Sequence, residues 1–375
     1  MCQAKKGSSG LESRKIDVLI PDGESVFSLA VLHGLSQADE KFRVHLISQN
    51  RCSPVRFSRY IESFTLCPEE DEARLHCILR AIRERGIDIL LPVHELGLKF
   101  VVKHKTRLES LVRIPPIADA DSFALVSDKG RLAHFLEAHN LASPCTLRYI
   151  PPHDVPDLTA LQFPALIKPA EGANGRGIKR FETASSLLEY FEAEAVDEDY
   201  IIQNYIDGYD IDCSVLCSDG EILAYTIQKG LAVGCGDYQA PTEIEFLHDQ
   251  AVYDLVSRML RKLSWSGVAH IDLRYDAVSG KINIIEINPR YWGSLPGSLI
   301  AGVNFPHLAC LATQNISFLA PDYHHVKYAA AKAALRLIRD KIFKGVKTDI
   351  RIGDTDLPNV LKDPLPEIVR LFFRC

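Results

Sequence analysis

Gly267-Val-Ala-His-Ile-Asp272-Leu-Arg-Tyr275 is an alternating apolar stretch that is followed, after a Ser279-Gly280 turn, by Ile284-Ile-Glu286-Ile-Asn288-Pro-Arg290. The two stretches and the turn predict a β-hairpin. Because side chains alternate along a strand, Asp272 shares a face with His270, and Glu286 shares a face with Asn288. Their carboxylate and amide oxygens suit Mg²⁺, which completes its shell with waters and substrate phosphates. The alternative is a polar sheet face that is exposed to water.

The composition limits the class of protein. The 375 residues have room for two or three domains, and 47% hydrophobic with 25% charged residues is ordinary for a globular chain. The 43 basic and 49 acidic residues give a net charge of -6, which argues against nucleic acid as a partner. No apolar run is long enough for a membrane span and the N-terminus lacks a signal-peptide core, so we expect a cytoplasmic protein. The ten cysteines form no Cys-x-x-Cys motif, and we expect them to be reduced.

The first third of the chain alternates short strands with helices. Residues 1–14 are polar, and we expect a disordered tail. Within residues 15–127, strand-length apolar runs at 16–20, 44–47 and 87–91 and a helical pattern from Glu72 to Arg85 predict an α/β domain with a Rossmann-like parallel sheet. Pro21-Asp-Gly-Glu-Ser25 replaces the Gly-x-Gly-x-x-Gly that would follow the first strand of an NAD-binding domain, which weakens the dehydrogenase alternative.

From residue 128 onward the pattern indicates antiparallel strands with helices, an α+β arrangement. Asp128 and Asp249 are expected to cap helices. Strands are predicted at 163–169 and 200–203, and Asp219-Gly220 predicts the turn of a second hairpin.

A glycine-rich loop follows the strand that carries Lys168. Gly172, Gly175 and Gly177 lie there among small polar residues. Such a loop lets backbone N–H groups approach phosphate oxygens, and a nearby lysine adds a positive charge. The loop lacks the P-loop pattern, so taken alone an ordinary β-turn is the alternative.

The order of these motifs resembles that of the ATP-grasp superfamily, and of its carboxylate–amine ligases in particular. The motifs are Asp128-Lys129, the strand with Lys168, the glycine loop, Gln203 to Asp210, Asp272, and Glu286-Ile-Asn288-Pro-Arg290. The continuation Asn288-Pro-Arg-Tyr-Trp-Gly-Ser294 looks closest to a carbamoyl-phosphate-synthase-like branch. The resemblance covers residues 15 to 315. It implies a pre-ATP-grasp domain at 15–127, a lid subdomain with its lead-in helix at 128–205, and a metal-binding subdomain at 206–315.

The resemblance also implies how ATP would be held. Lys129 and Lys168 would bind the phosphates, and the loop with Gly172, Gly175 and Gly177 would close over them. The main chain of the hinge from Gln203 to Ile206 would bind adenine, with the Asn204 carbonyl and the Ile206 amide facing the base. Asp210 would bind the ribose hydroxyls.

For the metal, the resemblance implies that Asp272, Glu286 and Asn288 are the ligands. Glu286 would bridge two Mg²⁺ ions, for which Mn²⁺ could substitute. Arg290 would steady the transferred phosphoryl group or the substrate carboxylate, a role that suits a planar guanidinium.

Some positions depart from the family pattern. Position 203 is Gln where many members have Glu. His270 stands where D-alanine–D-alanine ligases have Arg, which argues against that branch, and its role is left open between a phosphate contact and a polar face residue. Lys229 lies where other members place a phosphate-binding cation, but the alignment there is loose.

Residues 316–375 lie outside the resemblance, and we expect a helical extension. A helix is predicted from Tyr328 to Phe343 on the spacing of its apolar residues. Its basic residues are Lys332, Arg336, Arg339, Lys341, Lys344 and Lys347. The helix could pack on its own domain or dock on a membrane surface or an acidic partner.

The sequence therefore predicts an ATP-dependent ligase that activates a carboxylate as an acyl phosphate, joins it to an amine, and releases ADP and phosphate. The partners would be a small-molecule carboxylate and amine, and the sequence leaves a homodimer open. The alternatives are a carboxylase-like or thiol-forming ligase of the same superfamily, and a nucleotide-binding module without catalysis.

Overall fold

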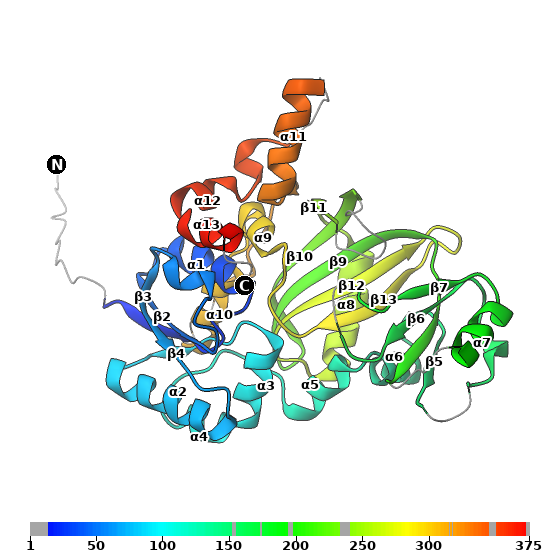
Figure 1. Ribbon diagram of the computed structural model, residues 1–375, viewed down its shortest axis with the longest axis horizontal. Coiled ribbons are helices and arrows are strands. Elements are labelled where there is room, and N and C mark those ends of the chain that lie inside the picture. The colour runs from blue at the N-terminus through cyan, green and yellow to red at the C-terminus, as the bar shows by residue number, and fades with distance from the viewer. Residues whose placement is uncertain are drawn as a thin grey trace, which may run out of the picture.

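A computed structural model of the chain describes residues 14–151, 155–172, 175–193, 198–232, 241–314, 316, 318–344 and 350–372. The tail predicted at residues 1–14 lies outside the described residues except for its last residue. Figure 1 shows the N-terminal sheet at one end of the molecule and the lid sheet at the other, with a larger sheet between them.

The N-terminal domain is built on a four-stranded parallel sheet in the order β3-β2-β1-β4. Its elements are β1 (Ile16–Ile20), α1 (Ser28–Ser36), β2 (Phe42–Ser48), η1 (Pro54–Phe57), β3 (Ile61–Leu66), α2 (Asp71–Arg85), β4 (Ile89–Leu90), α3 (Glu95–Lys103), α4 (Lys105–Glu109) and α5 (Ala120–Ser127). The parallel sheet confirms the α/β prediction. The sequence missed β3, an edge strand with no fully buried residue, because its polar residues interrupt the apolar run.

The lid subdomain contains a four-stranded antiparallel sheet in the order β5-β8-β6-β7. Its elements are α6 (Lys129–Ala138), β5 (Thr146–Tyr149), η2 (Leu158–Ala160), β6 (Ala165–Pro169), β7 (Lys179–Phe181), α7 (Ala184–Ala193) and β8 (Tyr200–Asn204). Asp128 caps α6 by accepting from the Gly130 and Arg131 amides, as predicted. A small core around Ile167, Leu187 and Ile202 is separate from the other hydrophobic clusters of the described residues. The lid therefore has a hydrophobic core of its own.

The central sheet has six antiparallel strands in the order β13-β12-β9-β10-β11-β14. Its elements are β9 (Gly208–Ser218), β10 (Glu221–Ala232), β11 (Glu243–Leu247), α8 (Gln250–Leu263), β12 (Gly267–Asp276), β13 (Ile282–Asn288) and β14 (Val326–Ala329), followed along the chain after β13 by α9 (Leu295–Ala301) and α10 (Phe305–Thr313). Both predicted hairpins, β9–β10 and β12–β13, form. Because the sheet changes between β8 and β9, we propose the boundary between lid and metal-binding subdomain there.

Alternation along β9 and β12 separates two environments. One face carries residues such as Cys213 and Ile271, which share a core with α8 and α2. The opposite face is apolar at one end, where Leu216 and Val268 join the second core, and polar farther along the same strands. The core thus fixes the strands while leaving a polar strip for chemistry.

The C-terminal segment has a strand where the sequence predicted the start of a helix. Tyr328 lies in β14, which pairs with β11 at the edge of the central sheet, and α11 (Ala331–Lys344) begins only afterwards. η3 (Ile352–Asp354), α12 (Leu357–Lys362) and α13 (Leu365–Phe372) follow. Helical spacing was misleading because the pairing of β14 with an open sheet edge is a tertiary effect. Lys347 lies outside the described residues.

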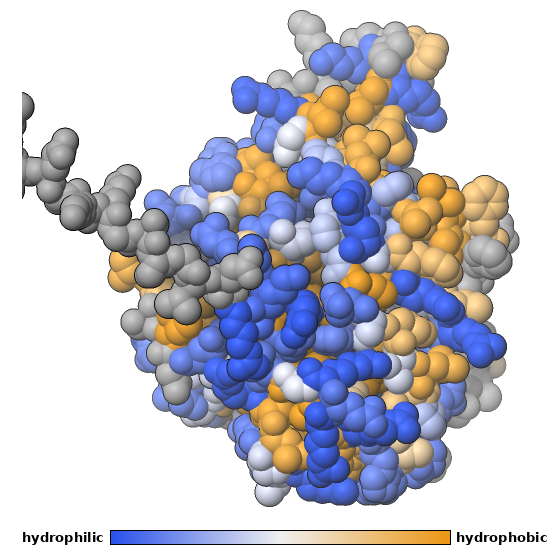
Figure 2. Space-filling model, turned by 90° about the vertical axis from the view of Figure 1, so that its left-hand side faces the viewer, coloured by the Kyte–Doolittle hydropathy of each residue, from blue (hydrophilic) through white to orange (hydrophobic). Residues whose placement is uncertain are grey.

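Surface hydropathy differs between these regions. On the face shown in Figure 2, hydrophilic residues predominate over the N-terminal domain, and hydrophobic residues are interspersed near the top, where the C-terminal helices lie. Exposed apolar side chains on these helices include Phe343, Leu361, Leu371 and Phe372. In the described part of the chain no single helix is long and apolar enough to cross a membrane, and only the bent pair Leu295–Ala301 and Phe305–Ala312 meets the length and composition criteria together.

Candidate active site

The polar strip on the central sheet brings the predicted metal ligands together. In the β12–β13 register Asp272 lies opposite Glu286, and His270 lies opposite Asn288. The Asn288 amide Nδ2 donates to Glu286 Oε1 at 3.2 Å and to Asp272 Oδ2 at 3.3 Å. Its Oδ1 accepts from the Arg290 guanidinium at 2.9 Å. One hairpin thus places two carboxylates, an amide and an arginine side by side.

Two lysines reach this strip from the lid side of the molecule. Lys129 begins α6, and its Nζ lies 3.3 Å from Glu286 Oε2 and donates to the Gly172 carbonyl at 2.8 Å. Lys168 lies on β6, is buried, and donates from Nζ to Gln203 Oε1 at 2.8 Å. Gln203 in turn donates to Thr146 Oγ1 at 2.9 Å. Hydrogen bonds within the lid sheet therefore hold the Lys168 side chain in place.

Burial and mutual charge shift the pKa values of these groups. Burial lowers the pKa of Lys168 to about 8, although the charges of Glu286 and Asp272 oppose the shift. Burial raises the pKa of Glu286, but Lys129, Asp272 and Lys168 outweigh it and lower the value to about 2. The pKa of Asp272 is raised well above its usual value, first by burial and then by the charge of Glu286. A cation that binds between the two facing carboxylates would therefore stabilise their charged forms.

Arg290 connects the hairpin to the N-terminal domain. It is buried, donates to the Tyr291 carbonyl at 3.0 Å, and lies with its guanidinium carbon 4.8 Å from the centre of the Phe27 ring. The ring of His94 also stacks on Phe27, at 5.9 Å between centroids. Because His94 follows β4, Arg290 faces the carboxyl end of the parallel sheet, where ligands of open α/β sheets bind.

The glycine loop has the backbone geometry that only glycine adopts readily. Gly172, Gly175 and Gly177 have φ of 125°, 68° and 75°. A Cβ at Gly177 would also come within 2.7 Å of Pro169 Cγ, whereas Gly172 has open space around it. The residues at 173 and 174 lie outside the described part of the chain.

The predicted adenine and ribose residues line the connection between β8 and β9. The Asn204 amide donates to the Cys145 carbonyl, and its side chain accepts from the Gln162 amide. Arg274 donates to the Ile206 carbonyl at 2.7 Å and to Asp210 Oδ1 at 2.5 Å. Asp210 is therefore paired with an arginine on the neighbouring strand.

Sequence reasoning missed Asp212, Gln228 and Arg274. Asp212 is buried and lies opposite Asp272 in the β9–β12 register. It accepts from Gln228 Nε2 at 3.1 Å, and burial raises its pKa to about 7. The only available signal was the alternation of Asp210, Asp212 and Ser214 along one strand face. Lys229, whose role the sequence left open, lies with Nζ 3.8 Å from the centre of the Tyr209 ring.

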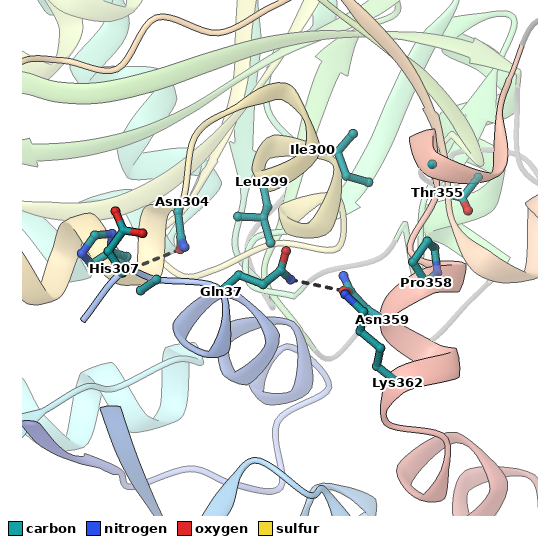
Figure 3. Close-up of a pocket in the computed structure, with 12 residues that line it drawn as sticks. Gln37, Leu299, Ile300, Asn304, His307, Thr355, Pro358, Asn359 and Lys362 are labelled. Atoms are coloured by element: carbon teal, nitrogen blue, oxygen red, sulfur yellow. Dashed lines mark hydrogen bonds between the residues drawn. The ribbon is translucent and has the colours of Figure 1, made fainter. Parts of the chain in front are cut away.

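A cavity of about 340 Å³ lies elsewhere, between the end of α1, the α9–α10 region and α12. Figure 3 shows Gln37, Asn304, Asn359 and Lys362 around it, with Gln37 and Asn359 joined by a hydrogen bond. It contains none of the predicted site residues, so this cavity is separate from the polar strip.

The middle part of the chain is similar to a known protein family. Residues 126–294 match the model of the ATP-grasp domain, which confirms the predicted resemblance and fold. The match includes both lysines, the glycine loop, the hinge and the metal-ligand candidates.

Individual relatives are distant. The chain is 26% identical over 291 residues to a carbamoyl-phosphate synthase of Methanobrevibacter smithii, covering 75% of this chain and 74% of that protein. It is 26% identical over 179 residues to a D-alanine–D-alanine ligase of Cupriavidus pinatubonensis. This match covers 44% of this chain and 54% of that ligase, so the chain spans about half of the ligase's length. The structure resembles that of N5-carboxyaminoimidazole synthetase from Staphylococcus aureus complexed with ADP, with a TM-score of 0.66 and 14% identity over 88% of this chain and 86% of the other.

Proposed function

We propose that this protein is an ATP-dependent carboxylate–amine ligase. It phosphorylates a substrate carboxylate to an acyl phosphate and transfers the acyl group to an amine, with release of ADP and phosphate. The relatives named above are consistent with this class, since a carbamoyl-phosphate synthase and a D-alanine–D-alanine ligase are among them.

One observation carries the proposal. Lys129 and Lys168 come from two separate elements of the lid side. Lys129 forms an ion pair with Glu286, and the charge of Lys168 interacts with those of Glu286 and Asp272. A buried lysine whose pKa is lowered to about 8 by burial gains most from an anionic ligand. Cations on one side and carboxylates on the other suit a polyphosphate bound together with divalent cations.

The surrounding residues then have defined tasks. The loop with Gly172, Gly175 and Gly177 closes over the phosphates and excludes water from the acyl phosphate. The main chain from Gln203 through Asn204 to Ile206 binds adenine, and Asp210, held by Arg274, binds the ribose. In this assignment the side chain of Gln203 orients Lys168.

The donor set fits Mg²⁺. Asp272 and Glu286 face each other across the hairpin, and carboxylate oxygens are hard ligands. Asn288 presents its Nδ2 to both carboxylates, so its amide would turn over to offer Oδ1. When bound, Mg²⁺ would neutralise charge that develops on the transferred phosphoryl group, and we propose that Asp272, Glu286 and Asn288 would hold two such ions.

The reaction needs no nucleophilic side chain. A substrate carboxylate oxygen attacks the γ-phosphorus of ATP, and ADP leaves with the electrons of the broken P–O bond. The amine nitrogen then attacks the acyl carbon, phosphate leaves, and the nitrogen loses a proton. Lys129, Lys168 and Arg290 stabilise the charge on the phosphoryl oxygens through charge-assisted hydrogen bonds.

A screen of carboxylic acids tests the proposal. Purified protein with Mg²⁺ and ATP should release ADP only with a cognate acid, and added hydroxylamine should yield the hydroxamate of that acid. ADP release that depends on bicarbonate would indicate the carboxylase-like ligase instead, and ADP release that depends on a thiol acceptor would indicate the thiol ligase. Nucleotide binding without turnover across the screen would indicate a non-catalytic module.

A further inference from the structure

A second set of metal-ligand atoms lies beside the proposed magnesium ligands. Asp212 on β9 and His270 and Asp272 on β12 each present one ligand atom, and all three atoms lie within 4.8 Å of one another. His270 Nε2 is 3.4 Å from Asp272 Oδ1 and 3.9 Å from Asp212 Oδ2. This set includes an imidazole nitrogen, and it excludes Glu286 and Asn288.

The imidazole is oriented by its other contacts. Its Nδ1 is hydrogen-bonded to Ser214 Oγ at 2.9 Å, directly across the β9–β12 pair. The ring stacks on the buried Trp292, with 5.7 Å between centroids and 14° between planes. Nε2 therefore points to the two carboxylates. In metal-binding histidines the second ring nitrogen is likewise hydrogen-bonded to an oxygen atom, which orients the ring.

The carboxylate of Asp212 is also held in place. Gln228 Nε2 donates to its Oδ2 at 3.1 Å, and Ser294 Oγ donates to Gln228 Oε1 at 2.7 Å. Among the described residues no lysine or arginine forms an ion pair with Asp212. A buried carboxylate fixed by neutral donors and lacking such a partner is stabilised when a cation binds.

We propose that Asp212, His270 and Asp272 bind a divalent first-row transition-metal ion in the absence of nucleotide. Imidazole suits these metals better than it suits Mg²⁺. In a tetrahedral site with bonds of about 2.1 Å, ligand atoms lie about 3.4 Å apart. The distance of 3.4 Å to Asp272 already has this value, and the distance of 3.9 Å to Asp212 needs only a small contraction. The side chain of Asp272 retains 34% exposure, which leaves room for water to complete the shell.

This ion is distinct from the proposed Mg²⁺ although both use Asp272. The magnesium set is completed by phosphates of ATP, so its occupancy rises with nucleotide. The imidazole set adds a nitrogen ligand, which transition-metal ions prefer over Mg²⁺, so we expect it to bind such an ion without nucleotide. The inference therefore goes beyond the ligase reaction and can be tested even if no substrate acid is known.

Electron paramagnetic resonance with Mn²⁺ as the probe tests the proposal. Full-length protein is treated with a chelator and titrated with Mn²⁺ in nucleotide-free buffer. We expect one bound ion per chain with the ¹⁴N modulation of a coordinated imidazole, and displacement by Zn²⁺. His270→Gln and Asp212→Asn should each weaken binding at least about tenfold and remove or diminish that modulation. Glu286→Gln and Asn288→Ala should retain both.

Four results would overturn the proposal. One is the absence of stoichiometric binding without nucleotide. Another is binding that is lost in Glu286→Gln but unchanged in His270→Gln, which would place the ion at the magnesium set. The third is bound Mn²⁺ without ¹⁴N modulation. Ser214→Ala is a milder variant that removes only the hydrogen-bond partner of His270 Nδ1. We expect it to weaken Mn²⁺ binding while its circular dichroism spectrum, which reports folding, is unchanged. Unchanged Mn²⁺ affinity in folded Ser214→Ala would also count against it.

Discussion

The carboxylate of Glu286 lies between Lys129 and Asp272, where the charges of the site are most concentrated. Glu286→Gln removes one charge with little change in volume. We expect magnesium-dependent ADP formation to fall at least about a hundredfold, because charge stabilisation at the phosphoryl group is lost. Glu221→Gln is a matched control, since that carboxylate forms only an exposed ion pair with Arg261. Wild-type ADP formation by folded Glu286→Gln would show that the ligand assignment is wrong.

Lys168 should give nucleotide binding a distinctive pH dependence. Its pKa is lowered by burial to about 8, so the cation that attracts phosphate is present below that pH and is lost above it. We expect affinity for a non-hydrolysable ATP analogue to be level below pH 8 and to fall towards tenfold per pH unit above it. Calorimetric titration at constant ionic strength measures this. In Lys168→Ala the affinity should be lower, and the fall beginning near pH 8 should disappear; the same fall in both proteins would assign it to another group.

Individual residues differ in how far the sequence could predict them. Asp272, Glu286 and Asn288 were recognised because alternation within one hairpin places them together. Asp212 was missed because its position opposite Asp272 depends on which strands pair, a long-range property. The link from Gln203 to Lys168 was missed for the same reason, since it crosses from β8 to β6.

At the scale of elements, the glycine loop after β6 should be the part that responds to nucleotide. Hydrogen exchange in peptides spanning residues 168–181 should be fast in the free protein and slower with nucleotide and Mg²⁺, as expected of a closing loop. Gly175 has φ of 68°, so Gly175→Val should hinder the loop and lower turnover more than stability.

Gly86→Val is the matched control for the loop. Gly86 ends α2 with φ of 63°, and a side chain added there would meet open space, so the backbone strain is similar but remote from the site. It should lower the free energy of unfolding with little effect on turnover of the folded protein. Exchange that ignores nucleotide, together with full activity of Gly175→Val, would favour an ordinary turn.

Elements with local signals were predicted and elements that depend on pairing were not. Asp128, Asp249 and Gly86 mark helix ends through their own capping chemistry, and the structure has these caps. The edge strands β3, β7 and β14 were missed because each takes its structure from a neighbouring strand, and β7 and β14 are also short. In the case of β14, the predicted helix began too early in the sequence, because the apolar spacing of α11 continues into the strand.

At the scale of the whole molecule, the C-terminal segment is fastened to the N-terminal domain by Asp363. This buried carboxylate accepts from Ser58 Oγ at 2.5 Å and from the Arg59 amide at 3.0 Å, and His33 Nε2 lies at 3.4 Å. Asp363→Ala should lower the free energy of unfolding by about 1.5–3 kcal/mol, the usual contribution of hydrogen bonds to a charged group. Urea unfolding measures this against Lys362→Ala, an exposed neighbour. Equal stability of the two variants would mean that the contact does not hold the segment.

The order of motifs along the chain was sufficient to predict the ATP-grasp fold, since that order resembles the family's and the family model matches residues 126–294. How the N-terminal domain meets the hairpin was beyond prediction. The contact of Arg290 with Phe27 joins residues far apart in sequence, and the hydrophobic cores are likewise shared between these regions.

The central claim is that a carboxylate is activated by phosphorylation. Once the screen identifies a cognate acid, that acid is supplied with ¹⁸O in its carboxylate, together with ATP, Mg²⁺ and the amine. The released phosphate is then analysed by mass spectrometry. Because the acyl phosphate takes its bridging oxygen from the acid and loses it with the phosphate, we predict one ¹⁸O atom in each phosphate released from fully labelled acid. Phosphate without ¹⁸O, formed together with the amide, would contradict the acyl-phosphate mechanism.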